Sequence, residues 1–308
     1  MRPSLIILLA VGSVAALPQH IWEDSDASAS KSPSPHPPLP TMFTISTPAP
    51  INPEKPDIPL LSPRSTTNES AGTSKRGLAY KADNVLAAWS GKPVSWAYNW
   101  GVSHGAMPSN IAFIPMVWCP TGTTVDSWKS TASSAIASGS RALLSFNEPD
   151  NSGQCGISYA QAASTYQQYM NPFKGKATLI SPSVSNSVVS GQGLTYLENF
   201  LKACNGKCNI DAVGFHWYGD AGNAANDLKA YVNKCIALAK KYGISSVWLT
   251  EFGLTNASAQ QQADFLHSVL PWLDSNGAVG GYAYFLCADG SLMTGTSISS
   301  PLGQAYAS

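Results

Sequence analysis

Eight apolar, strand-like runs follow one another between residues 77 and 308, and this succession limits the fold more than any other feature of the sequence. Stretches with helical periodicity separate most of these runs. The runs cover residues 77–80, 94–100, 112–118, 141–147, 177–184, 210–218, 246–251 and 279–286. The helical stretches cover residues 125–138, 159–170, 195–203, 227–242 and 259–274. Repeated strand–helix units predict an α/β fold with a parallel sheet that is buried on both faces.

The number of units predicts a single (β/α)8 TIM barrel over residues 77–308. These 232 residues are close to the length of about 250 that is typical of such barrels. Gly139, Gly243 and Gly277 follow helical stretches at the places where C-cap glycines end helices. A doubly wound sheet is the alternative, but it usually carries a glycine-rich phosphate loop after its first strand. Here residues 81–84 read Lys-Ala-Asp-Asn, which is no such loop.

The first 76 residues differ in character from the rest. Residues 1–16 are typical of a secretory signal peptide, with Arg2, an apolar stretch and a small-residue cleavage site at 14–16. Residues 17–76 hold 12 of the 22 prolines and many Ser and Thr, which predicts a disordered leader or pro-segment. The pair Lys75-Arg76 ends it and suggests a processing site, although an attached linker is the alternative. We expect a secreted protein, either free outside the cell or associated with the cell wall.

The charge balance of residues 77–308 excludes several classes of partner. This part has 12 Lys/Arg and 12 Asp/Glu, so it lacks the basic surface that nucleic-acid binding and polybasic membrane attachment need. The apolar stretch at 5–14 is too short for a membrane-spanning helix of about 20 residues. Eight of the nine tryptophans lie here, which favours a neutral, hydroxyl-rich ligand, although many Trp side chains simply fill cores. We expect a monomer that needs no cofactor and no metal.

All six cysteines lie in residues 77–308, where a secreted protein would form disulfides. Cys204 and Cys208 are close enough in sequence to close a small loop. Cys119 and Cys155 both follow predicted strands and so can meet at one end of the fold, while Cys235 fits a buried thiol in a helix. The sequence alone does not choose among the possible pairings.

Only three glutamates occur between residues 77 and 308, and two of them end apolar strands. Glu148 ends the fourth run and Glu251 the seventh, so a barrel would bring both to the catalytic face despite 103 positions of separation. Strand alternation predicts that Leu144, Phe146 and Glu148 share one face, as do Val247, Leu249 and Glu251. Glu198 instead fits the surface of a helix. Two carboxyl groups at one site are what glycosidic hydrolysis requires.

The strings around these glutamates resemble those of a large clan of barrel glycosidases that retain configuration. More narrowly, the chain resembles glycoside hydrolase family 128, the alkali-sensitive-linkage-like catalytic core, over essentially all of residues 77–308. The matching strings are RGLAY at 76–80, SWAYNW at 95–100, LSFNEPD at 144–150, FHWYG at 215–219 and WLTEFG at 248–253. The leader departs from the bare catalytic core, and Cys119 stands where the family more often has Gly.

The resemblance implies an endo-acting β-1,3-glucanase with Glu148 as general acid/base and Glu251 as nucleophile. In such a retaining enzyme the two carboxyl groups stand about 5–5.5 Å apart. We expect the charge of Glu251 to raise the pKa of Glu148 and so keep this carboxyl protonated as the acid. Asn147 is placed to bind a sugar 2-hydroxyl, and Tyr218 to donate a hydrogen bond to Glu251.

The other candidate substrate-binding residues rest on position alone. His216 shares a strand face with Tyr218, so it is either a substrate ligand or a buried, hydrogen-bonded histidine. Several polar and aromatic residues lie at strand ends, where each can line a sugar subsite or simply pack. They are Asn99, Trp100, Trp118, Trp217, Tyr284 and Phe285.

Three other functions compete with β-1,3-glucan hydrolysis. A metal-dependent hydrolase is disfavoured because His104, His216 and His267 show no metal-ligand spacing. A hydrolase of another β-glycan, such as β-1,4-glucan, mannan or xylan, stays open because fold does not fix substrate. A non-catalytic glucan-binding protein of the cell wall is disfavoured because both carboxylates are present.

Overall fold

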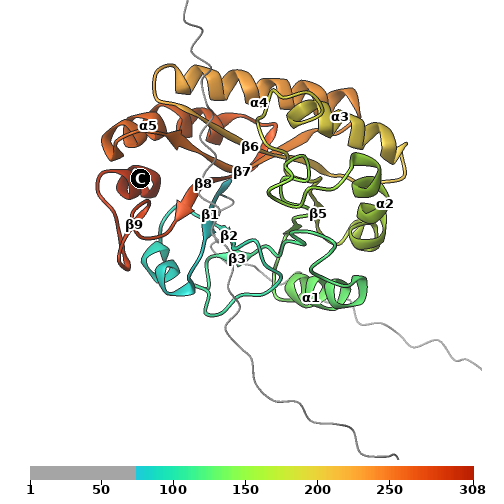
Figure 1. Ribbon diagram of the computed structural model, residues 1–308. Helices are drawn as coiled ribbons and strands as arrows, with labels where there is room; N and C mark the ends of the chain where they lie inside the picture. The colour runs from blue at the N-terminus through green and yellow to red at the C-terminus, as the bar shows by residue number, and fades with distance from the viewer. Residues whose placement is uncertain (1–73) are drawn as a thin grey trace, which may run out of the picture. The chain divides into compact units, whose positions relative to one another are not determined.

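The computed structural model describes residues 74–308 of the chain (Figure 1). The predicted signal peptide and residues 17–73 of the predicted leader lie outside the described residues. The eight long-range strands are β1 (Arg76–Tyr80), β2 (Trp96–Tyr98), β3 (Ala112–Phe113), β4 (Ala142–Leu143), β5 (Thr178–Leu179), β6 (Ala212–Asp220), β7 (Ser246–Thr255) and β8 (Val279–Cys287). The α-helices are α1 (Val125–Ala137), α2 (Tyr159–Tyr169), α3 (Gly193–Cys204), α4 (Ala224–Lys241), α5 (Ala259–Ser275) and α6 (Leu302–Ala307).

The remaining elements are short. Two 3-10 helices, η1 (Asp83–Trp89) and η2 (Asn171–Phe173), and a hairpin of β9 (Met293–Thr294) with β10 (Ser297–Ile298) complete the described chain. The five predicted helical stretches are confirmed as α1 to α5. Thr124, Ser158 and Ser258 cap α1, α2 and α5, each accepting a backbone N–H with its side chain, which fixes where these helices begin. No helical stretch was predicted between β2 and β3, and their connection contains no helix.

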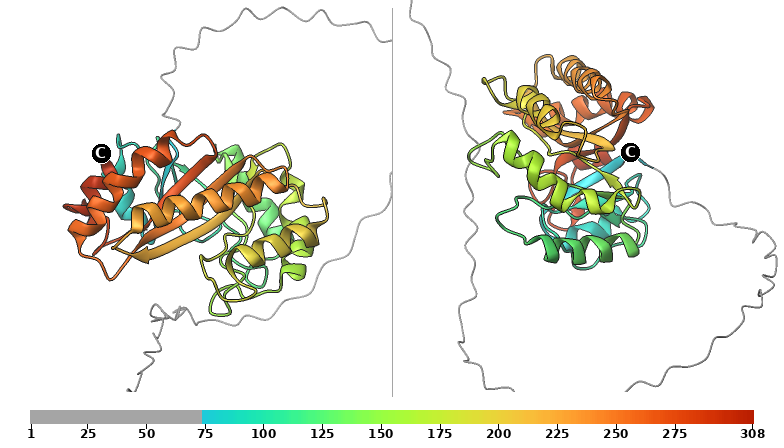
Figure 2. Two further views of the ribbon diagram at one scale, coloured as in Figure 1. Left: turned by 90° about the horizontal axis from the view of Figure 1, so that it is seen from above. Right: turned by 90° about the vertical axis from the view of Figure 1, so that its right-hand side faces the viewer.

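The strands pair in parallel in the order that the sequence predicts. β3, β2, β1, β8, β7 and β6 form one six-stranded sheet, and β4 pairs with β5. Three bridges join the two sheets: Met116 pairs with Leu144, Ile180 with Ala212, and Val184 with Phe215. Each of the eight strands is therefore hydrogen-bonded to the next one along the chain, and β8 is hydrogen-bonded to β1. Helices α1 to α5 lie outside this arrangement in chain order (Figures 1 and 2).

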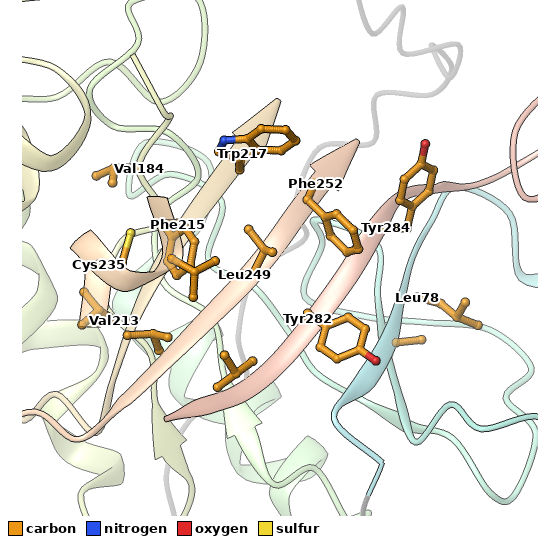
Figure 3. Close-up of a cluster of buried hydrophobic side chains, with 14 of the residues drawn as sticks. Leu78, Val184, Val213, Phe215, Trp217, Cys235, Leu249, Phe252, Tyr282 and Tyr284 are labelled. Carbon is orange, nitrogen blue, oxygen red and sulfur yellow. The ribbon is translucent and has the colours of Figure 1, made fainter. Parts of the chain in front are cut away.

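Two apolar clusters separate the inside of the strand ring from its outside. The smaller cluster contains strand residues and no helix residue, and its centre is the contact between Trp96 and Trp248, whose rings lie 5.0 Å apart. Gly77 and Gly281 make room for these indoles, because a Cβ at either position would meet one of them at less than 3 Å. The larger cluster joins the outer strand faces to the helices. Figure 3 shows part of it, including Phe215, Leu249, Phe252 and Tyr282.

The predicted faces of the fourth and seventh strands are wrong. Trp248 lies in the inner cluster while Leu249 packs outside, and the pairing of β6 with β7 then shifts, so that Phe215 faces Leu249 but His216 faces Glu251. The extra residue in β7 is Thr250, a β-bulge that turns Glu251 to the face opposite to that of Leu249. Strand β4 changes face in a similar way, since Leu144 is an inner residue and Phe146 an outer one.

The predicted boundary of the leader at residue 76 also needs correction. Ser74, Lys75 and Arg76 belong to the fold, and Arg76 is the first residue of β1, with 5% of its surface exposed. Its three guanidinium nitrogens donate to Tyr282, to Asp274 and to the carbonyls of Tyr306 and Ser308. A basic pair looks like an exposed processing site in the sequence, but here the arginine is a buried anchor.

Two disulfides form in the pairs that the sequence brought together. Cys119 bonds to Cys155, and Cys204 to Cys208. Cys235 is a buried free thiol, as expected, and Cys287 is another. Among the described residues, no helix combines the length and the apolar composition needed to cross a membrane.

Candidate active site

Glu148 and Glu251 meet at one site, joined by the imidazole of His216. Nδ1 of His216 lies 2.8 Å from Oε1 of Glu148, and Nε2 lies 3.5 Å from Oε1 of Glu251. His216 has no exposed surface, whereas 14% of the Glu148 side chain and 8% of the Glu251 side chain remain exposed. Both carboxylates are therefore reachable from solvent, while the base between them is not.

Glu251 is held by neutral hydrogen-bond donors on both of its oxygens. The Tyr218 hydroxyl donates to Oε2 at 2.6 Å, which confirms the hydrogen bond predicted from the sequence. The Trp100 indole N–H donates to Oε1 at 2.8 Å. Burial, and then the charge of Glu251, raise the pKa of the Tyr218 phenol well above its usual range. The hydroxyl therefore remains a donor, and the two hydrogen bonds fix the orientation of the carboxylate.

Glu148 follows β4 and its environment differs from the one predicted. Burial alone would raise the pKa of its carboxyl, but the hydrogen bond and charge of His216 and the hydrogen bond from Asn151 outweigh burial and lower this pKa. The Asn151 amide donates to Oε2 at 3.1 Å. We expected the charge of Glu251 to raise the pKa of Glu148. That prediction is wrong because the imidazole of His216, whose own pKa is raised, stands between the two carboxylates.

His216 shows the complementary change. Burial alone would lower its pKa, but the charge of Glu251 and the hydrogen bond and charge of Glu148 raise it above the usual value of 6.5. The lowered pKa of Glu148 and the raised pKa of His216 both favour a proton on His216 over one on Glu148. A proton at this site is therefore held by the Glu148–His216 pair rather than by the glutamate alone.

Two buried polar atoms at this site have no hydrogen-bond partner within the described residues. They are Nε2 of His216 and Oδ1 of Asn147. Asn147 uses its amide N–H to reach Gln154 at 3.3 Å, which leaves its carbonyl oxygen free. Buried polar atoms are nearly always paired in folded proteins, so unpaired ones at a single site point to a function for that site.

The other predicted substrate-binding residues are placed differently. Trp118 follows β3 and is 37% exposed, which leaves its ring open to a ligand. Asn99 makes its hydrogen bonds within the loop after β2, to Ser103 and Gly101. Tyr284 is fully buried in the outer cluster, where Figure 3 shows it beside Phe252, and it bonds to Gln262 of α5 rather than to either glutamate. Trp217 likewise stacks on Phe265 of α5.

The sequence-based prediction missed Tyr98 and Asn151 and gave Trp100 no role beside Glu251. Tyr98 donates to the carbonyl of Thr250 at 2.9 Å and lies 3.5 Å from Oε1 of Glu251. A signal for the two aromatics was present, because alternation along β2 places Trp96, Tyr98 and Trp100 on one face. Asn151 lies in the loop after Glu148, where no pattern marks it.

The family comparison matches most of the described chain. The family model described as glycosyl hydrolase catalytic core matches residues 77–306. A curated relative, alkali-sensitive linkage protein 1 of Schizosaccharomyces pombe (strain 972 / ATCC 24843), is 32% identical over 234 residues. The match covers 70% of this chain and 39% of that relative, so this chain corresponds to less than half of it.

Solved structures give the same picture. A family 128 (subgroup III) curdlan-specific exo-β-1,3-glucanase from Blastomyces gilchristii, in complex with glucose, is 44% identical with a TM-score of 0.72 and covers 77% of this chain and 99% of its own. A subgroup I endo-β-1,3-glucanase from Amycolatopsis mediterranei, bound to laminaritriose and laminaribiose, is 29% identical with a TM-score of 0.65, covering 77% and 99%. A subgroup IV endo-β-1,3-glucanase from Lentinula edodes is 30% identical with a TM-score of 0.55, covering 70% and 84%.

Proposed function

Because the chain belongs to the glycosyl hydrolase catalytic-core family, and within it to glycoside hydrolase family 128, we propose that it is a secreted, retaining endo-β-1,3-glucanase built on a (β/α)8 barrel. It is a glycoside hydrolase. The observation that carries the proposed mechanism is a pair of partly exposed glutamates, Glu148 after β4 and Glu251 within β7, bridged by the buried His216.

In the first step, Glu251 attacks the anomeric carbon and forms a glycosyl ester while the bond to the leaving oxygen breaks. Glu148 protonates that oxygen, with the proton that the Glu148–His216 pair holds across its 2.8 Å contact. Trp100 and Tyr218 fix the attacking carboxylate in one orientation through its two oxygens. Such positioning lowers the barrier because little rearrangement is needed when the bond forms.

In the second step, water attacks the anomeric carbon of the ester. Glu148 takes a proton from this water, hydroxide adds to the sugar, and Glu251 leaves as a carboxylate. The proton returns to the Glu148–His216 pair, which restores the starting state. Configuration at the anomeric carbon is inverted twice and is therefore retained.

The choice of β-1,3-glucan rests on the relatives, which include β-1,3-glucanases at 29–44% identity. Trp118, exposed after β3, supports a sugar ligand because an aromatic face can stack on the apolar face of a pyranose ring. Exo-action is the second candidate, since the relative at 44% identity is an exo-enzyme. The disulfides support secretion, because they persist in oxidising compartments.

The test is a digestion of soluble β-1,3-glucan by the full chain, beside β-1,4-glucan, xylan and mannan. We expect a rapid fall in the viscosity of β-1,3-glucan together with a series of oligosaccharides, and no product with Glu251→Gln. Release of one small sugar with a slow fall in viscosity would establish exo-action. Products only from another polymer would replace the substrate, and binding of β-1,3-glucan without cleavage would overturn the enzymatic proposal.

A further inference from the structure

Positive backbone φ angles single out one aromatic residue at the active site. Within residues 74–308, four residues other than glycine have positive φ: Trp100 (61°), Glu148 (39°), Asn205 (45°) and Asn256 (52°). Asparagine tolerates this region, but the same conformation strains the backbone of a residue as bulky as tryptophan. Both unusual residues, Trp100 and Glu148, belong to the site that contains the two carboxylates.

The strained backbone at Trp100 carries the indole to a distant strand. Trp100 follows β2, whereas Glu251 lies on β7, and strands β1 and β8 stand between them in the sheet. The indole N–H nevertheless reaches Oε1 of Glu251 at 2.8 Å. Asn99 stabilises the turn, because its side chain accepts the N–H of Gly101 and donates to the carbonyl of Ser103.

Two neighbouring rings hold the indole in this position. The Tyr98 ring lies 5.2 Å from that of Trp100, and the Phe285 ring contacts it edge-on at 5.8 Å. Phe285 also packs edge-on against Tyr218, the donor to the other oxygen of Glu251. The two donors to the carboxylate are thus linked through one aromatic ring, which restricts how either can move.

We propose that Trp100 is a positioning residue for the nucleophile: its indole N–H fixes Oε1 of Glu251 while Tyr218 fixes Oε2. This inference rests on the proposed function, in which Glu251 attacks the sugar. Both donors are neutral, so they orient the carboxylate without cancelling the charge with which it attacks. The alternative role for Trp100 is a stacking platform for a sugar ring.

Steady-state kinetics of Trp100→Phe on a laminari-oligosaccharide separate these roles. Phe keeps an aromatic face but loses the N–H, so we expect kcat to fall about 10- to 100-fold with KM nearly unchanged. Trp128→Phe is the matched control, because it removes another buried indole donor, the 3.0 Å bond from helix α1 to the carbonyl of Tyr169, which contacts neither glutamate. We expect the control to keep its kcat. An unchanged kcat in Trp100→Phe, or a rise in KM alone, would overturn the positioning role.

A second measurement does not depend on activity or on the stability of Trp100→Phe. In a nitrogen–proton NMR spectrum of the wild-type full chain, the indole N–H of Trp100 should lie downfield because its acceptor is a carboxylate. We expect one indole signal to move upfield in Glu251→Gln, and the absence of any such movement would contradict the hydrogen bond. Failure of the proposed function is separate, since it would appear as a wild-type chain that cleaves no β-1,3-glucan.

Discussion

Two buried networks of charged side chains, one around Arg76 and one around His216, differ in how completely their polar groups are paired. At the start of β1, every nitrogen of the Arg76 guanidinium has an acceptor, and the backbone around it is ordinary. At the carboxylate site, Nε2 of His216 has no hydrogen-bond partner among residues 74–308, and Trp100 and Glu148 have positive φ. The first network is typical of a stabilising cluster, whereas the unpaired groups and backbone strain of the second are typical of an active site.

This difference predicts that substitutions at the two networks separate activity from stability. Substitutions in the carboxylate cluster should reduce catalysis strongly and change the free energy of unfolding little. Substitution of Arg76 should lower the free energy of unfolding and leave catalysis unchanged. Natural active sites often carry such local destabilisation, so removing a charge there can even stabilise the protein. The following four substitutions test the separation, beginning with the largest expected effect.

Glu251→Gln should abolish nearly all activity while leaving the fold intact. Loss of the nucleophile should reduce kcat about 10³-fold or more, because no ester can form. The free energy of unfolding in urea should stay the same or increase, since the variant removes one of two carboxylates beside His216. A clear loss of stability would show that the cluster also stabilises the fold, and the comparison would then fail.

Arg76→Ala should do the opposite. It leaves the carbonyls of Tyr306 and Ser308 and the side chains of Tyr282 and Asp274 without their shared donor, so we expect the unfolding free energy to fall by about 3 kcal/mol. Well below the unfolding transition, kcat and KM should equal those of the wild type. Reduced kcat in fully folded protein would mean that the two ends of the strands are coupled.

His216→Gln should change the pH dependence more than the size of the activity. In the wild type the Glu148–His216 pair holds the catalytic proton, so activity is lost as pH rises through the raised pKa of His216. Without the imidazole, Glu148 alone holds the proton and titrates from a lower usual value, 4.5 against 6.5. The alkaline limb of kcat/KM should therefore move to lower pH. An unmoved limb would exclude His216 as the holder of the proton.

The same pair also makes a stability prediction. The lowered pKa of Glu148 gives stability that is present above 4.5 and is lost as pH falls through its folded value. The raised pKa of His216 gives stability that is present below 6.5 and is lost as pH rises through its folded value. The difference in unfolding free energy between wild type and His216→Gln should therefore be largest between pH 4.5 and 6.5. A difference that does not vary with pH would contradict the pairing.

Lys241→Gln should have the smallest effect. Lys241 bonds to Glu198 at 2.6 Å on the helix surface, and most of its side chain is in water. Exposed ion pairs are screened and add little to stability. The urea midpoint and kcat should both stay within the scatter of repeated wild-type measurements, and a reproducible shift in either would show that exposed charge matters here as well.

Much of the fold could be predicted because hydrophobic periodicity reports burial directly. The five main helices and the eight strand-like runs came from that pattern, and Glu148 and Glu251 stood out because predicted runs end there, although β7 continues to Thr255. The face of Glu251 could not be predicted, since the bulge at Thr250 depends on how β7 pairs with β6. The identity of Arg76 as an anchor was also hidden, because its acceptors lie about 200 residues further along the chain.

The electrostatics of the site were the least predictable part. The pKa direction of Glu148 depends on whether a base stands between the two glutamates, and a sequence gives no distances. The strand pattern did place His216 and Tyr218 on one face, which was enough to predict the bond from Tyr218 to Glu251. The pattern also placed Tyr284 and Trp217 near strand ends, but it did not predict that both side chains contact helix α5.

The most direct test of the two-glutamate mechanism is the configuration of the first product. Hydrolysis of a β-1,3-linked laminari-oligosaccharide by the full chain can be followed by proton NMR at the anomeric position, before mutarotation mixes the anomers. Double displacement through Glu251 predicts that the β-anomer appears first and the α-anomer later by mutarotation. If the α-anomer appears first, water attacks the sugar directly, and Glu251 is not the nucleophile.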